Sequence, residues 1–67
     1  MIDDKELVKK LKPELKRLKL EHDQVITICI VMKRNPKHLD ECLKYLSGVE
    51  LGTDGENIAT EIIDICY

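Results

Sequence analysis

An unbroken apolar run at residues 25–32, with the sequence VITICIVM, is the feature that most constrains the fold of this chain. Its only polar side chain is that of Thr27, and Lys33 and Arg34 close it abruptly. The run is far shorter than the roughly 20 apolar residues needed to cross a bilayer. In a chain of 67 residues with no Phe and no Trp, burial of this run must supply much of the stability or of the affinity for a partner.

The length indicates one domain, residues 1–67, with a marginal core. A chain this short removes only about 60% of its extended-chain surface from water, so disulfides, a metal or self-association would have to reinforce it. The three cysteines, Cys29, Cys42 and Cys66, are odd in number and far apart, and the first residues lack the pattern of a secretory signal. We therefore expect free thiols in a reducing, cytoplasmic setting.

The first segment has the spacing of an amphipathic helix, predicted over residues 4–19. Pro13 complicates this helix because it lacks an amide donor and its ring presses on the carbonyl of Lys9, which costs about 3 kcal/mol in a helix interior. We expect the segment to be kinked or split there. The inward stripe of this helix consists of four leucines, Leu7, Leu11, Leu15 and Leu18. Five lysines lie largely off that stripe: Lys5, Lys9, Lys12, Lys16 and Lys19.

Residues 36–47 carry the clearest local signal for a helix. Asn35 is a good N-cap, Pro36 fits the first helical position, and Gly48 suits a left-handed stop. A second helix is predicted after the following loop, over residues 54–66. Its signals are a Thr-x-x-Glu capping box and an isoleucine stripe with helical spacing, formed by Thr53, Glu56, Ile58, Ile62 and Ile65.

The apolar run itself fits either a strand or a helix. Its β-branched residues favour a strand, and strands at 25–32 and 58–66 around a helix at 36–47 would make a βαβ unit, an α/β fold. The last segment, however, shows no two-residue alternation, which would leave a strand at 25–32 without a partner. We therefore predict an all-α fold, a small compact bundle of about four short helices, at residues 4–19, 22–34, 36–47 and 54–66.

A helix at 22–34 would be apolar on all sides, and three short neighbours with one apolar stripe each cover it only in part. The sequence therefore predicts a non-enzymatic protein-interaction module or small regulatory protein. We expect it to self-associate as a homodimer through this helix, or to bind an unidentified protein partner. The predicted interface has an apolar centre and a charged rim, formed by Ile26, Ile28, Ile30 and Val31 and by Lys12, Lys16 and Arg17.

Two alternative functions follow from the uneven charge of the chain. Residues 1–20 carry a net charge of +3 and residues 41–67 a net charge of −5, within a total of −2. The acidic part could occupy a basic surface of a nucleic-acid enzyme, as small inhibitors from mobile elements do. The basic first helix could instead bind nucleic acid, although the aromatic residues available for stacking are only Tyr45 and Tyr67.

No residue pattern indicates catalysis, a cofactor or a metal. His38 and Cys42 share a helix face, but a structural zinc site needs four ligands and no second close-spaced pair is present. We interpret Cys42 as a small buried hydrophobe and His38 as a solvated residue. Cys66 is expected to be exposed, near a helix C-terminus that would raise its thiol pKa. The sequence therefore predicts no enzyme, no cofactor, no metal and no membrane segment.

Overall fold

The leucine spacing of the first segment produces one continuous helix in the computed structural model, which describes residues 3–67. Helix α1 spans Asp4–Arg17 with Pro13 inside it, so the prediction of a split helix was wrong. Pro13 is exposed, on the side of the helix opposite the buried leucines. Burial of that leucine stripe holds the turn in place although the proline donates no hydrogen bond.

A residue in the left-handed conformation turns the chain from α1 into the next helix. Lys19 has a φ of 55°, a conformation common just beyond helix ends. Helix α2 spans His22–Arg34 and begins with a capping box of Glu21 and Gln24, in which the Glu21 N–H donates to Gln24 Oε1 across 3.0 Å. The whole apolar run is therefore helical. The prediction for residues 22–34 is confirmed, and the strand alternative was wrong.

The third predicted helix begins as a short 3-10 turn. This turn, η1, spans Pro36–His38, and helix α3 follows at Leu39–Gly48. Asn35 does not cap the helix that follows it; its side-chain nitrogen donates to the carbonyl of Val31 across 2.9 Å, at the end of α2. The predicted N-cap of residue 35 was therefore wrong, because the amide serves the preceding helix.

The end of α3 and the start of the last helix also differ from their predicted signals. Gly48 does not have a positive φ, and the left-handed glycine is Gly52 in the following loop, at 92°. Helix α4 spans Gly55–Cys66 and is capped by Asp54, whose carboxylate accepts from the Glu56 N–H across 3.1 Å. The Thr53 hydroxyl instead donates to the carbonyl of Glu50, so the predicted capping box does not form.

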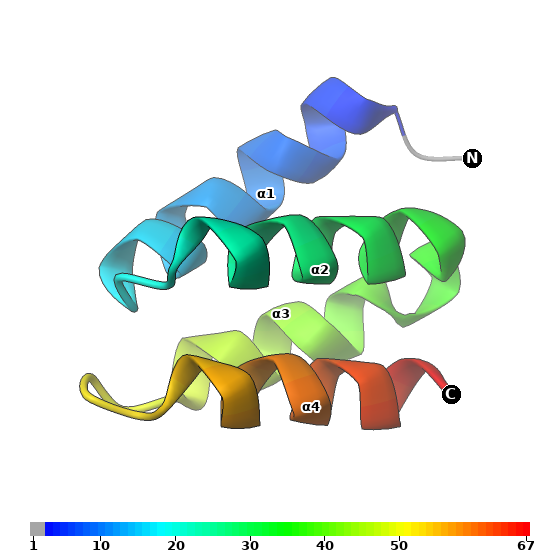
Figure 1. Cartoon of the computed structure of the whole chain (residues 1–67). Helices are drawn as coiled ribbons and strands as arrows, with labels where there is room; N and C mark the ends of the chain where they lie inside the picture. Colours follow the sequence, from blue (N-terminus) through cyan, green and yellow to red (C-terminus); the bar gives the residue numbers. More distant parts are fainter. Residues whose placement is uncertain (1–2) are drawn as a thin grey trace.

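The four helices form two layers (Figure 1). Helices α2 and α4 lie side by side and run in the same direction, while α1 and α3 lie behind them and run in the opposite direction. The most extensive packing is between α2 and α4. Residues 3–67 contain no strand, so the all-α bundle is confirmed and the βαβ alternative was wrong. None of the helices in this range combines the length and apolarity needed to cross a lipid bilayer.

One hydrophobic core lies between the two layers. Each helix contributes a stripe at three- and four-residue spacing, as an amphipathic helix does. Burial of each large aliphatic side chain contributes about 1.5 to 3 kcal/mol. The core residues are Leu7, Leu11, Leu15, Leu18, Ile28, Val31, Met32, Leu39, Cys42, Leu46, Val49, Ile58, Ile62 and Cys66.

Candidate binding face between α1 and α2

Helix α2 buries one side of the apolar run and leaves the other in solvent. Ile28 is 0% exposed and Val31 is also buried, so these two predicted interface residues are core residues of this chain. They are turned inward because α4 packs along that side of α2. Ile26 and Ile30 are 42% and 47% exposed and lie one turn apart on the outer side. Of the four predicted apolar interface residues, these two are available to a partner.

An apolar groove of about 500 Å³ runs between α1 and α2. Its floor and walls are aliphatic, apart from the thiol of Cys29, and α1 and the following turn supply lysines to its edge. No carboxylate lines it. The lining residues are Val8, Leu11, Leu15, Leu20, Val25 and Cys29, with Lys12, Lys16 and Lys19 at the edge.

The groove continues into a smaller hollow of about 220 Å³ beside the start of α1. Val8 and Cys29 line both, and Ile30 joins them in the hollow. Val8 is 47% exposed, and Ile26 lies three residues before Cys29, on the same side of α2. We call the groove, the hollow and the exposed side chains of Val8, Ile26 and Ile30 the α1–α2 face. It is a continuous apolar surface built from both helices.

A row of lysines borders this face along α1. Spacings of three and four residues place Lys5, Lys9, Lys12 and Lys16 on the edge of α1 next to Val8, and Lys19, in the turn after the helix, lines the groove with them. All five are exposed, and none has a carboxylate within 4 Å among residues 3–67. Lys33, at the far end, is paired with Asp4 across 3.1 Å. The border of the face is therefore positive and largely uncompensated.

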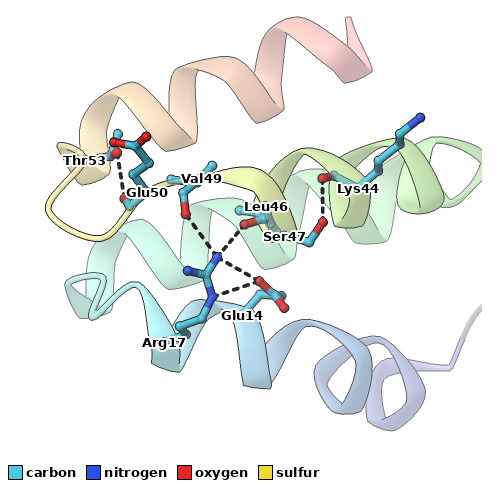
Figure 2. Close-up of polar contacts among 8 residues, drawn as sticks. All are labelled: Glu14, Arg17, Lys44, Leu46, Ser47, Val49, Glu50 and Thr53. Atoms are coloured by element: carbon cyan, nitrogen blue, oxygen red, sulfur yellow. Dashed lines mark hydrogen bonds and ion pairs between the residues drawn. The ribbon is translucent and has the colours of Figure 1, made fainter.

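Arg17, by contrast, does not belong to this border. Figure 2 shows its guanidinium turned towards α3, where Nη2 donates to the carbonyls of Leu46, across 2.8 Å, and Val49, across 3.2 Å. Glu14 accepts from the same group across 3.1 Å. Arg17 therefore ties α1 to the end of α3 and does not line the groove, and its place on an interface rim stays a prediction. Lys12 and Lys16 do lie on the rim of the groove.

A larger and shallower hollow, of about 700 Å³, lies on the opposite hairpin, between α3 and α4. Glu41 and Lys44 line it with opposite charges, and Tyr45 and Ile65 form part of its wall. Burial, and secondarily the negative charge of Glu61, raise the pKa of the Tyr45 hydroxyl. This hollow has neither the exposed aliphatic side chains nor the lysine border of the α1–α2 face, where the Asp4 carboxylate is paired with Lys33. We therefore regard the α1–α2 face as the better candidate site.

The cysteines are free thiols and two of them meet in the core. Cys42 is buried as predicted, but Cys66 is buried too, contrary to the prediction, with its Sγ 3.8 Å from that of Cys42. Burial, then the contact with Cys66, raises the pKa of the Cys42 thiol to about 12. Burial also raises the pKa of Cys29. The thiols of Cys42 and Cys29 are therefore poor nucleophiles, since the thiolate is the reactive form.

His38 is less solvated than the sequence indicates. Its Nδ1 is buried without a hydrogen bond, and the nearest carboxylate oxygen, Oε1 of Glu41, is 3.5 Å away. Cys42, its predicted neighbour on the helix face, points into the core. Residues 3–67 contain no group of three or more His, Cys, Asp or Glu side chains placed to hold a metal ion.

Part of the acidic surface gathers in a groove between α2 and α4. Glu21 and Asp23 from the start of α2 line it together with Glu56 from the start of α4. The other exposed acids of residues 41–67 are Glu41 on α3, Glu50 and Asp54 in the loop before α4, and Glu61 and Asp64 on α4.

Val8 is the site residue that the sequence interpretation missed. It lies next to Leu7 but off the leucine stripe, so on its own it resembles an incidental exposed aliphatic residue. The available signal was its position on the same side of the helix as the five lysines. Comparison of the chain with protein-family models, with curated proteins and with solved structures gave no match.

Proposed function

We propose that this chain is a non-enzymatic protein-interaction module that binds a protein partner through the α1–α2 face. One observation carries this proposal: the exposed side chains of Val8 and Ile30 line a connected apolar groove and hollow on one side of a very small domain, and exposed Ile26 lies one helical turn from Ile30. Contiguous apolar patches of this kind mark interaction surfaces, whereas single exposed aliphatic residues do not.

The test is capture of a partner from the native cell by the full chain. A Val8→Glu/Ile30→Glu variant should lose the captured protein, because charges would be buried in the apolar part of the interface. Ile63→Glu is the matched control, since Ile63 is 38% exposed but lies on α4, outside the face. Both variants should keep the helical circular dichroism of the wild type. Equal capture by the wild type and the double variant would remove the α1–α2 face as the binding site.

Self-association remains part of this proposal, with two of the four predicted apolar interface residues, Ile26 and Ile30, available for it. The reason to expect a second copy was an apolar helix that its own chain could not cover, and the chain buries Ile28, Val31 and Met32 of that helix while Ile26 and Ile30 stay exposed. A homodimer through α2 would rest on Ile26 and Ile30. Light scattering of the wild type at tens of micromolar is the measurement: a dimer that becomes monomeric on Ile30→Glu supports it, and a wild-type monomer ends it.

The regulatory role and the cytoplasmic setting belong to the same proposal. Support for a reducing compartment comes from the odd number and wide spacing of the three cysteines. The acidic-inhibitor alternative rests on the net charge of −5 of residues 41–67, without an apolar groove of the kind that supports the α1–α2 face.

A further inference from the structure

We infer that the α1–α2 face receives an amphipathic helix of another protein, whose aliphatic stripe is flanked by carboxylates. This inference rests on the proposed function and specifies the chemistry of the partner. The groove follows α1 and α2, so a helix laid along it would present residues at i, i+3, i+4 and i+7 to the floor.

The lysine row determines the charge of that partner. From Lys5 to Lys16 the row extends over about 16 Å along α1, at 1.5 Å per residue, which is the length of about three helical turns, and Lys19 adds a charge in the turn that follows. A helix of that length with Glu or Asp beside its apolar stripe could pair with the row from end to end. Basic flanks would instead face five uncompensated positive charges at close range.

The aliphatic floor argues for a protein partner over a nucleic acid. Val8, Leu20 and Val25 offer no aromatic ring on which a base could stack. Their desolvation is favourable only against another apolar surface. A phosphate backbone would use the lysines and leave the floor in water.

Helix α4 of a second copy of this chain is a poor occupant of the groove. This acidic helix carries Glu56 and Asp64 on exposed positions, but its Ile58 and Ile62 are fully buried in the core of its own chain. Ile63 is the large aliphatic side chain that α4 exposes. One such side chain cannot fill a groove of about 500 Å³. The occupant is therefore a helix that brings its own aliphatic stripe.

The probe for this inference is a designed peptide of about 18 residues, which is long enough to follow the lysine row. It carries Leu at heptad positions a and d and Glu at e and g, where like charges keep the peptide from pairing with itself. A second peptide has Lys in place of every Glu. Both are labelled and titrated with the full chain by fluorescence anisotropy, alongside a labelled DNA duplex.

We expect the acidic peptide to bind, and the basic peptide not to bind. The triple variant Lys12→Glu/Lys16→Glu/Lys19→Glu should bind the acidic peptide with an affinity at least about tenfold lower than that of the wild type. The reason is that each exposed ion pair contributes up to about 1 kcal/mol. The control Lys10→Glu/Lys37→Glu/Lys44→Glu makes the same change of net charge with exposed lysines outside the groove, and should lower the affinity for the acidic peptide about threefold or less. Binding should also weaken as NaCl rises from about 0.05 to about 0.3 M.

Three results would overturn the inference: equal binding of the basic peptide, equal loss of affinity in the two triple variants, or tighter binding of the duplex than of the acidic peptide.

Failure of this inference is separable from failure of the proposed function. If Val8→Glu/Ile30→Glu abolishes capture of the cellular partner but the acidic peptide does not compete for it, the binding face stands and the acidic-helix partner is wrong. If that variant captures the partner normally, the proposed function itself is wrong.

Discussion

The guanidinium of Arg17 donates to the main-chain carbonyl of Leu46 across 2.8 Å and so joins the end of α1 to the end of α3 (Figure 2). The same nitrogen also reaches the carbonyl of Val49. The last carbonyls of a helix have no partner within the helix, and a positive charge there also complements the helix dipole. Arg17 therefore acts as a side-chain cap supplied by a neighbouring helix.

Replacing Arg17 by Met should lower the free energy of unfolding by about 1 to 3 kcal/mol, because it leaves two part-buried carbonyls without a charged donor. Arg34→Met is the matched control, since Arg34 is exposed at the end of α2 and has no carboxylate partner within 4 Å among residues 3–67. Urea denaturation followed by circular dichroism measures both. A loss as small as that of the control would mean that the Arg17 contacts contribute nothing to stability.

Ile28 and Ile26 provide a matched pair two residues apart on one helix. Ile28→Ala should cost about 2 to 5 kcal/mol, because it opens a cavity in the core. Ile26→Ala should cost less than about 1 kcal/mol, because the side chain is already partly in water. Denaturant titration of the two variants gives the difference directly. Equal costs would contradict the orientation of α2 described above.

Pro13→Ala should raise the stability by about 1 to 2 kcal/mol. The substitution restores an amide donor inside α1 and removes the clash with the carbonyl of Lys9, while the more flexible unfolded chain offsets part of the gain. The midpoint of urea unfolding should increase. Lys10→Ala, at another exposed position of the same helix, should change it little, and a Pro13→Ala variant less stable than the wild type would contradict the continuous helix.

The thiol of Cys42 makes stability depend on alkaline pH. Burial and the contact with Cys66 raise its pKa from 9.0 to about 12 in the folded chain. Between these two values the unfolded chain carries a thiolate and the folded chain keeps the thiol, so the unfolded state binds fewer protons and stability falls as pH rises. The contribution of the Cys42 thiol to the free energy of unfolding is therefore full below pH 9.0. Above that pH it decreases by at most about 1.4 kcal/mol per pH unit.

A Cys42→Ala variant isolates that contribution. It is less stable than the wild type at neutral pH, but the difference between the two should narrow from about pH 8 to about pH 11. Tyr45 also titrates at alkaline pH, with a raised pKa, but it is present in both proteins and cancels in the comparison. Urea unfolding at several pH values provides the curve, and a constant difference would show that Cys42 keeps its ordinary pKa.

The helical fold was predictable because the stripes of three segments are unambiguous. Leu7, Leu11 and Leu15 in α1, and Ile58 and Ile62 in α4, recur at helical spacing and are buried as that spacing predicts. The helix ends were less predictable, because several residues compete for each cap. Asp54 takes the position that the Thr53 pattern indicated, because its carboxylate reaches an amide of the first turn.

The binding face was predictable only in part. The run in α2 is apolar on every side, so no alternation of apolar and polar residues tells that Ile28 is buried and Ile26 is exposed. Only the packing of α4 against α2 decides which of them is buried. The contacts of Arg17 with α3 were unpredictable for a similar reason: its two main-chain acceptors lie 29 and 32 residues away in the chain, beyond any local pattern.

The parallel packing of α2 and α4 brings the starts of both helices together. Two helix N-termini carry partial positive charge of the same sign, and their mutual repulsion must be compensated. The carboxylates of Glu21, Asp23 and Glu56 in the shared groove supply that compensation, as does the Asp54 cap. These acids thus act as counter-charges of the fold, which leaves fewer of them free to attract a basic molecule than the sequence count suggests.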